Sequence, residues 1–455
     1  MKKWILLAAV LLGCIPVGAQ QVAEVTVYPS RENGPVKMMN AANNFASAGP
    51  KAKELGVPYA KELACPYSRI HDAERVPHGS GIIDINAIFP DFAKDPTKPE
   101  NYNFHHSDRY MKSVMATGTK PLYRLGQSAE SGAGKIGSVP PADFKKWAVI
   151  CEHVVRHYNE GWANGFHYGI EYWEIWNEAN IKSFWTGTQE QYFELYTVTA
   201  KHLKKCFPEL KIGGPAVAGG DIQWSEAFLQ HIRAKEAPLD FFSYHKYTTD
   251  PSILVQITRD MRTLLYKYGY DGLEMQLGEW NYVTGWSTPE VNYSNKVRRT
   301  ELGGAFAAAV MCALQKERVD KLFFYDLREY TRYNNAYDRY SATPWPAYYA
   351  LYAWAQLRKL GTSVDVSCPA PDIYTCAAKA PDGRAGLLVV RYNNDGNVVM
   401  PATVQVSVEG YDLSDAICFM TDDSFLFSGL PVSPKNGQLT FDMQPNSFAY
   451  ITFSR

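Results

Sequence analysis

The chain has 455 residues, of which 46% are hydrophobic and 20% charged, enough material for a large buried core. Because single cores stop growing at roughly 250–300 residues, the length predicts one large domain with a smaller one. Lys and Arg (46) almost balance Asp and Glu (47), so the charge gives no basis for binding a nucleic acid or an anionic membrane surface.

Residues 1–19 have the three parts of a signal peptide. Two lysines precede an apolar run over residues 4–15, and small residues at 17–19 form a cleavage site. The run is shorter than the about 20 residues of a membrane span, and no later stretch approaches that length without a charge or a proline. We therefore expect a secreted or periplasmic protein without a membrane span that begins at Gln20. A Leu-Leu-Gly-Cys sequence leaves lipid anchoring at Cys14 as the alternative.

Residues 36–360 alternate short apolar runs with longer helical stretches, a pattern typical of parallel β/α units. One helix is expected to open at 142–147 after a pair of prolines, and an Ala-rich amphipathic helix at 300–314. Eight such strands would close a (β/α)8 TIM barrel. The predicted strands are 36–39, 67–70, 120–123, 172–176, 211–213, 240–244, 274–277 and 321–324.

Residues 361–455 have short alternating runs, for example at 403–408 and 439–443, which predict an antiparallel β-sandwich domain at the C-terminus. The run 386–392 leads into Asn-Asn-Asp-Gly at 393–396, so we expect it to pair through a tight turn with a strand that begins at Val398. The N-terminal segment 20–35 could add a further strand to this sandwich.

The cysteines do not form a recognisable framework. Removal of Cys14 leaves an odd, scattered set, which argues against paired disulfides. Cys368 and Cys376 could bridge a short loop, and buried free thiols are the alternative. No Cys/His cluster has the spacing of zinc ligands. We therefore expect neither a metal nor an organic cofactor.

The fourth predicted strand ends in polar residues, Asn177 and Glu178, after a run that contains two tryptophans. Functional residues of a barrel lie at the C-terminal ends of its strands, so Glu178 is expected at the barrel mouth with the Asn177 amide beside it. Cleavage of a glycosidic bond needs such a carboxylic acid, with a raised pKa, to protonate the leaving oxygen. A solvated loop glutamate is the alternative.

A second carboxylate, Glu279, follows the seventh predicted strand. Only a closed barrel can bring it close to Glu178, because strands four and seven then face each other across the mouth. A separation of about 5–5.5 Å between the two carboxyl groups would indicate a retaining enzyme, and one of about 6.5–9.5 Å an inverting enzyme. A capping or ion-pairing role for Glu279 is the alternative.

Together these motifs resemble the retaining clan A glycoside hydrolases, and within that clan glycoside hydrolase family 39, which includes β-xylosidases and α-L-iduronidases. The resemblance covers both the barrel and the sandwich. It implies that Glu178, which follows Asn177, is the acid/base and that Glu279 is the nucleophile. The chain has Ala179 where the family usually has a proline, a departure that bears on the subfamily more than on the clan.

His245 and Tyr247 follow the sixth predicted strand, where the family has a histidine near the nucleophile. The resemblance implies that His245 binds a sugar hydroxyl or orients Glu279, and that Tyr247 assists. A packed or surface histidine is the alternative.

Four more residues are candidates for substrate binding. Arg69 and His71, after the second strand, could hold the nucleophile or the substrate, or could form a buried structural ion pair. Trp280 and Trp286 could stack on sugar rings, with ordinary core packing as the alternative. Charged or polar residues also follow strands three and eight, namely Arg124, Gln127, Asp326 and Arg328.

The sequence therefore predicts a retaining, β-xylosidase-like glycoside hydrolase that cleaves a plant or host polysaccharide or oligosaccharide by double displacement. Asn177 would bind a ring hydroxyl next to the reacting carbon. The expected partner is a carbohydrate, and the sequence specifies no oligomeric state. The alternatives are a barrel that binds carbohydrate without catalysis, a glycosidase of other specificity (α-L-iduronidase-like or β-galactosidase-like), and a lyase that uses His245 with a tyrosine.

Overall fold

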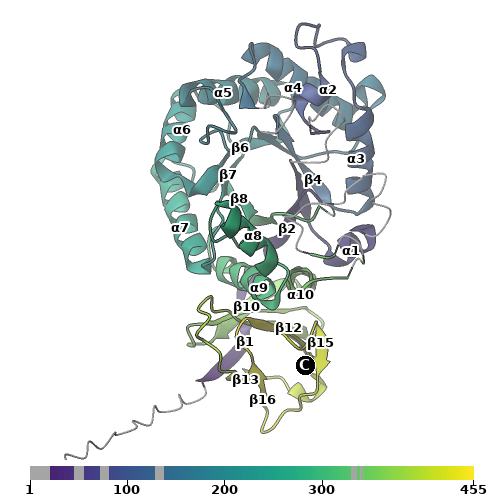
Figure 1. The fold of residues 1–455 in the computed structure, drawn as a ribbon. Coiled ribbons are helices and arrows are strands. Elements are labelled where there is room, and N and C mark those ends of the chain that lie inside the picture. Colours follow the sequence, from purple (N-terminus) through teal and green to yellow (C-terminus); the bar gives the residue numbers. More distant parts are fainter. Residues whose placement is uncertain are drawn as a thin grey trace, which may run out of the picture.

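The computed structural model describes residues 21–45, 56–71, 81–128, 138–328, 336–338, 341 and 343–455 (Figure 1). The predicted signal peptide, with Cys14, lies outside these residues. The described chain forms a barrel and a separate sheet, which lies below helices α9 and α10 in Figure 1.

The barrel is closed by eight parallel strands that follow one another in sequence order. This confirms the predicted (β/α)8 fold, and β3 and β9 have the predicted bounds. The strands are β2 (Met38–Asn43), β3 (Tyr67–Ile70), β4 (Lys120–Leu125), β5 (Tyr172–Ile175), β6 (Lys211–Val217), β7 (Phe241–His245), β8 (Glu274–Trp280) and β9 (Lys321–Phe324).

Helices surround the barrel, and their ends follow local signals. The helix expected near 142–147 is α4, whose first turn is capped by Asp143 through the backbone N–H groups of Lys145 and Lys146. The Ala-rich helix is α9, preceded by Thr300. The helices are α1 (Gly56–Leu63), α2 (Ile85–Ile88), α3 (His105–Ala116), α4 (Phe144–Glu160), α5 (Gln189–Cys206), α6 (Ile222–Ala234), α7 (Pro251–Lys267), α8 (Thr288–Val297), α9 (Glu301–Gln315) and α10 (Pro346–Leu360).

Large side chains fill the inside of the barrel near the N-terminal ends of its strands. Tyr67, Tyr172 and Phe241 pack there in one cluster, and Glu274 pairs with Lys321 beside them. This end is therefore closed, and polar side chains with room for a ligand gather at the opposite end of the strands.

The second domain is a nine-stranded sheet in the order β15-β14-β17-β12-β11-β10-β1-β13-β16. Its pairs are antiparallel except β1 with β13, which are parallel. Segment 21–35 thus forms a strand inside this sheet. The strands are β1 (Gln21–Pro35), β10 (Thr362–Ser367), β11 (Ile373–Lys379), β12 (Arg384–Arg391), β13 (Ala402–Val408), β14 (Ile417–Thr421), β15 (Ser428–Leu430), β16 (Leu439–Met443) and β17 (Ser447–Ser454).

One expectation for this domain is wrong: β12 and the strand that follows it do not form a hairpin. β12 pairs with β11 and β17, whereas β13 pairs with β1 and β16. The Asn-Asn-Asp-Gly sequence is part of a longer connection over 392–401 that contacts the barrel. Turn residues alone did not reveal that both sides of β12 were already occupied by other strands.

The sheet is buried on two faces where it meets the barrel. In β12, Leu387 and Val389 join the core of the sheet domain, whereas Leu388 and Val390 join the core that includes α9 and α10. This arrangement explains the uninterrupted apolar run in β12, because a strand that is buried on both faces needs no polar alternation.

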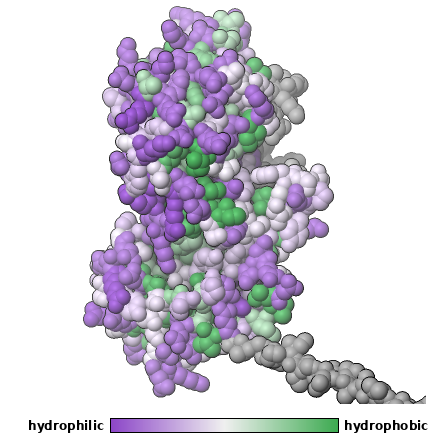
Figure 2. All heavy atoms as spheres, turned by 90° about the vertical axis from the view of Figure 1, so that its left-hand side faces the viewer, coloured by the Kyte–Doolittle hydropathy of each residue, from purple (hydrophilic) through white to green (hydrophobic). Residues whose placement is uncertain are grey.

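One face of the molecule is shown in Figure 2. It is mainly hydrophilic, with hydrophobic residues in a strip near its middle. Among the described helices, none is both long and hydrophobic enough to cross a membrane. Cys368 and Cys376 are free thiols rather than a disulfide.

The position of β1 generates a prediction about stability. Val25 is fully buried and lies opposite Val406 of β13. We expect Val25→Asp to destabilise the protein by about 3 kcal/mol or more, since it buries a carboxyl group without a partner. Glu24→Gln, on the exposed face of the same strand, is the control. Calorimetric melting of both variants checks the prediction, which fails if their melting temperatures are equal.

Candidate active site

A buried arginine links the polar residues at the barrel mouth. Arg69, in β3, donates from Nε to Glu174 Oε2 (2.7 Å) and from Nη1 to Glu279 Oε1 (2.9 Å). It also donates to Asn43 Oδ1 (3.1 Å) and to Asn177 Oδ1 (2.7 Å). Burial disfavours the charged guanidinium, but the two carboxylates outweigh this effect and raise the pKa of Arg69. A single side chain therefore joins the ends of β2, β5 and β8.

Glu279 lies near the end of β8, and its carboxylate is enclosed on several sides. Oε2 accepts a hydrogen bond from the Tyr247 hydroxyl (2.6 Å), and Oε1 accepts from Arg69. Burial raises the pKa of Glu279 above its ordinary value. The nearby His245 opposes this rise, Glu178 adds to it, and Arg69 and the Tyr247 hydrogen bond oppose it. The carboxyl group is thus held between effects that favour its ionised and its neutral form.

His71 contacts the same carboxylate as a neutral ring. Burial lowers the pKa of His71 well below its ordinary value, and the neighbouring Arg124 and Arg69 add to this effect. Its Nδ1 accepts a hydrogen bond from Arg124 Nε (3.1 Å). The hydrogen of the neutral ring is therefore on Nε2, which lies 3.5 Å from Glu279 Oε1. His71 thus faces the predicted nucleophile, as the sequence suggested for it and for Arg69.

Glu178 is carried into the mouth by an unusual backbone turn. Trp176 and Glu178 both have left-handed backbone conformations, with φ of 68° and 49°. The Glu178 amide donates to the carbonyl of Ala216 (3.0 Å), which holds the turn against β6. Such conformations are uncommon for residues with a side chain and cluster at functional sites.

His245, the last residue of β7, lies between the two predicted catalytic carboxylates. Its Nδ1 is 2.7 Å from Glu178 Oε1 and 3.6 Å from Glu279 Oε1. The ring packs against Gly278, where a Cβ atom would lie only 3.0 Å from His245 Nε2. A glycine before Glu279 therefore leaves the space that the histidine ring occupies.

The two carboxyl groups meet at one end of the barrel. One carboxylate oxygen of Glu178, one of Glu279 and a ring nitrogen of His245 all lie within 4.8 Å of one another. Glu178 follows β5 and Glu279 lies in β8, which are the fourth and seventh strands of the barrel, as expected.

Two groups of described side chains have ligand atoms close enough to share a metal ion. One is the Glu178, His245 and Glu279 group, which already lies beside the cationic Arg69. The other is Glu152, His202 and Cys206 on the outer face of α4 and α5, where His202 pairs with Glu152 (2.6 Å). The chemistry of the first group is that of paired carboxylic acids, and the second is remote from it.

Asn177 has an amide nitrogen available at this site. Its Oδ1 accepts from Arg69, whereas its Nδ2 is buried and has no hydrogen-bond partner among the described residues. Asn177 also lines the cavity next to Glu178. Because an unpaired buried N–H group is costly, this amide is suited to donate to a ligand.

The cavity above these residues has a volume of about 610 Å³, within the range typical of ligand sites. Its lining combines polar side chains with the apolar side chains of Ile181, Phe184 and Trp286. The described lining comprises His71, Asn177, Glu178, Asn180, Ile181, Ser183, Phe184, Ala218, Gly219, Lys246, Tyr247, Glu279, Trp286 and Tyr325.

The two candidate tryptophans have different positions. Trp286 is 63% exposed and lies at the rim, with its ring edge-on to Tyr247. Trp280 is fully buried and packs against Phe306 and Phe324. The prediction that Trp280 stacks on a sugar is therefore wrong, because alternate residues of a strand point to opposite sides and Glu279 already occupies the inner side.

Sequence reasoning missed two residues that organise the site. Glu174 lies inside β5, fully buried, and accepts hydrogen bonds from Arg69 and from Ser243 (2.6 Å). Asn43 ends β2 and bonds both Arg69 and the Gly278 carbonyl (2.8 Å). A charged residue within the otherwise apolar run of β5 was the available signal for Glu174.

Other polar residues after the strands have supporting contacts. Arg124 is buried and donates to His71 and to Asp84 (3.0 Å), so it holds His71 from behind. Arg328 pairs with Asp326.

Comparison with known proteins adds independent information. Residues 23–263, more than half of the chain, match the family model described as glycosyl hydrolases family 39. This stretch includes Glu178 and His245 and ends before Glu279. The chain is 30% identical over 268 residues to a beta-xylosidase of Geobacillus stearothermophilus, a match that covers 51% of this chain and 50% of the relative. The chain thus spans about half the length of that relative.

Solved structures show the same fold over nearly the whole chain. A glucosidase from Croceicoccus marinus superimposes with a TM-score of 0.77 at 19% identity, covering 96% of this chain and 99% of that one. A monomeric beta-xylosidase from Caulobacter crescentus superimposes with a TM-score of 0.71 at 17% identity, covering 95% and 99%. At these sequence identities, the structural similarity shows a shared fold only.

The hydrogen bond from Tyr247 generates a prediction about Glu279. Because it stabilises the ionised carboxylate, its removal in Tyr247→Phe should raise the pKa of Glu279 further, by about one to two pH units. A carboxyl ¹³C NMR titration, with the signal assigned through Glu279→Gln, measures this shift. Tyr102→Phe, which removes a hydrogen bond to the carbonyl of Pro96 instead, should leave the Glu279 titration unchanged. A Tyr247→Phe titration that matches wild type would contradict the assignment.

Proposed function

Because the chain belongs to glycosyl hydrolases family 39, we propose that it is a retaining glycoside hydrolase that cleaves β-xylosides in a plant or host oligosaccharide or polysaccharide. The observation that carries this proposal is the meeting of Glu178 and Glu279, with carboxylate oxygens within 4.8 Å at one end of the barrel. Retaining enzymes keep their two carboxyl groups about 5–5.5 Å apart and inverting enzymes about 6.5–9.5 Å, and the close approach of these oxygens supports the retaining arrangement.

Glu279 acts as the nucleophile on the anomeric carbon. Arg69 and Tyr247 fix its two oxygens and favour the ionised form that attacks. The C–O bond to the leaving group breaks as the bond from Glu279 forms, which gives a covalent glycosyl-enzyme. Burial of this carboxylate removes the water that would otherwise stabilise its charge.

Glu178 supplies the proton to the leaving oxygen and then takes a proton from the attacking water. His245, at 2.7 Å, orients the carboxyl group that performs both transfers. Water adds to the anomeric carbon from the side that the leaving group vacated, and Glu279 departs as a carboxylate. The product keeps the configuration of the substrate.

The apolar and amide groups of the cavity suit a neutral sugar. The Asn177 Nδ2 donates to a ring hydroxyl beside the reacting carbon, and Trp286 offers an exposed aromatic face at the rim. The choice of a xyloside follows the named activity of the Geobacillus stearothermophilus relative. We also propose that the protein acts after export, in the periplasm or outside the cell, on the basis of residues 1–19.

The roles of the two carboxylates can be separated with azide and an activated aryl β-xyloside. In Glu279→Ala, azide should replace the nucleophile and give the glycosyl azide of inverted configuration. In Glu178→Ala, the glycosyl-enzyme still forms from an activated substrate, its hydrolysis slows by about 10²–10⁴-fold, and azide should give the azide of retained configuration. NMR of the products identifies the configuration.

Glu209→Ala is the matched control, because Glu209 is exposed in the loop before β6. It should retain wild-type turnover without azide. Undiminished activity in Glu279→Ala, or an azide product of the same configuration from both active-site variants, would refute the proposed roles. A panel of aryl β-xylosides, β-glucosides, β-galactosides, α-L-arabinosides and α-L-iduronides tests the sugar.

A further inference from the structure

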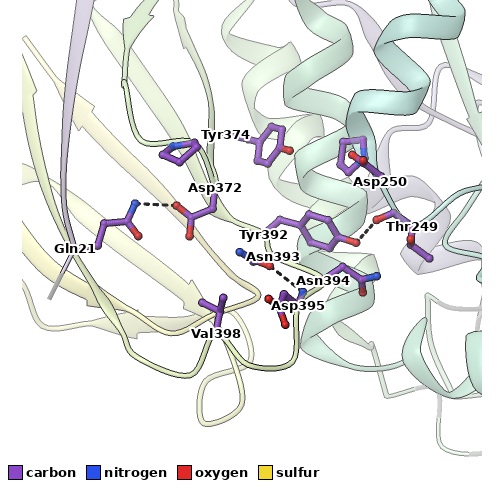
Figure 3. Close-up of a pocket in the computed structure, with 12 residues that line it drawn as sticks. Gln21, Thr249, Asp250, Asp372, Tyr374, Tyr392, Asn393, Asn394, Asp395 and Val398 are labelled. Carbon is purple, nitrogen blue, oxygen red and sulfur yellow. Dashed lines mark hydrogen bonds between the residues drawn. The ribbon is translucent and has the colours of Figure 1, made fainter. Parts of the chain in front are cut away.

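A second cavity lies at the junction between the barrel and the sheet domain (Figure 3). We call it the junction pocket. It has a volume of about 630 Å³ and is lined by segments 249–251 before and at the start of α7, 371–374 at β11, and 392–395 after β12, with Gln21 and Val398 at its edge. It shares no lining residue with the cavity above Glu178 and Glu279.

The junction pocket is built by direct contacts between the two domains. The Tyr392 hydroxyl donates to the carbonyl of Thr249, and Gln21 Nε2 donates to Asp372 Oδ1 (2.9 Å) (Figure 3). Asp372 also accepts from the buried Arg391 (3.1 Å). These bonds fix the walls in the absence of a ligand, which lowers the entropy lost when one binds.

Side chains in the walls retain hydrogen-bonding capacity. Asp250 and Asp395 each use one carboxylate oxygen, on the backbone N–H groups of Ser252 (2.8 Å) and Asn397 (3.0 Å). Tyr374 is partly exposed and lines the pocket, as Figure 3 shows. The Tyr392 ring is almost fully buried and packs against Phe306, so the aromatic surface of the walls comes from Tyr374.

The charge of the junction pocket selects against two classes of ligand. Its described lining contains three aspartates and neither a lysine nor an arginine, which disfavours phosphates, sulfated chains and uronates. The three carboxylates are also not gathered for a cation, because they do not belong to either group of described side chains whose ligand atoms lie within 4.8 Å of one another. A ligand that suits the pocket therefore carries no negative charge and offers donors, such as hydroxyl groups, to the free carboxylate oxygens.

We propose that the junction pocket is a second binding site, for a neutral saccharide. Sugar hydroxyls donate to the free oxygens of Asp250 and Asp395, and the apolar face of one sugar ring lies against Tyr374. Such a site holds a chain of sugars on the protein while the barrel mouth acts on an end or a branch. The choice of arabinoxylan as one of the probes rests on the function proposed above, whereas the proposed class of ligand, a neutral saccharide, does not.

The test is affinity electrophoresis of the full chain, which measures how much a soluble neutral polysaccharide in a native gel slows (retains) the protein. Arabinoxylan, xyloglucan and galactan are used in separate gels. The Glu279→Gln variant serves as the parent so that the polymer is not cleaved. We expect at least one of these polymers to slow the parent. Adding Tyr374→Ala should raise the dissociation constant at least about fivefold through loss of ring contact and a hydroxyl.

Tyr28→Ala is the matched control, because Tyr28 is a partly exposed tyrosine of the same sheet that contacts Arg31 and lies outside the junction pocket. It should be retained like the parent. In chains with an intact Glu279, Tyr374→Ala should keep wild-type turnover of a small aryl glycoside. Failure of turnover with every aryl glycoside would overturn the proposed function, whereas retention in the gels reports on the junction pocket alone.

Three results would overturn the inference. One is equal retention of the parent and its Tyr374→Ala variant in every gel. Another is retention of the parent by polygalacturonate but by none of the neutral polymers. The third is a rise in melting temperature with CaCl₂ that Asp395→Asn abolishes, since that would identify a cation site.

Discussion

The barrel mouth depends on one buried charge, the guanidinium of Arg69. It contacts Glu174, Glu279 and the Asn177 amide, while Glu178 lies close by. Burial raises the pKa of Glu279 and the nearby Glu178 adds to this effect, whereas His245 and Arg69 oppose it. The charge of the Glu279 carboxyl group is therefore set by the groups that surround it at the barrel mouth. Perturbed carboxyl groups of this kind are typical of sites that carry acid/base or nucleophilic chemistry.

Backbone geometry places the remaining parts of the mouth around this charge. The left-handed turns at Trp176 and Glu178 bring the Glu178 carboxyl group off the end of β5, and Gly278 leaves the space for the His245 ring. These are local departures from regular strands, held by contacts such as the one between the Glu178 amide and Ala216. Strained backbone of this kind persists only where its surroundings determine it, and here the closed barrel supplies those surroundings. The regular strands bring the catalytic side chains to the same end of the barrel, and the irregular strand ends set their final positions relative to one another.

This division explains what could be predicted from the sequence. The eight barrel strands were visible because apolar runs and helical stretches alternate, and Glu178 and Glu279 because polar residues follow two of these runs directly. Asn43 was missed, since its role comes from contacts across the barrel that no local pattern encodes. Glu174 was missed although a charged residue within the apolar run of β5 was visible in the sequence. Trp280 was assigned to the wrong side because strand direction decides which neighbour of Glu279 points inward. The hairpin after β12 was predicted from its turn residues, but β17 and β11 flank that strand, and pairing partners depend on the whole sheet.

The sheet domain is also part of the architecture of the mouth, through the connection over 392–401. Tyr392 holds the carbonyl of Thr249, two residues after the tyrosine that donates to Glu279. Asn394 accepts from Tyr282 (2.8 Å), three residues after Glu279, and Thr248 is bridged to Tyr282. The loops that follow β7 and β8 therefore rest on each other and on the sheet domain. Because β12 and β17 share an apolar core with α9 and α10, this support is rigid rather than a surface contact. The apolar residues of β12 anchor the connection over 392–401, and this connection supports the loops that follow β7 and β8. The core of the sheet domain thus helps to position the Tyr247 hydroxyl relative to the Glu279 carboxylate.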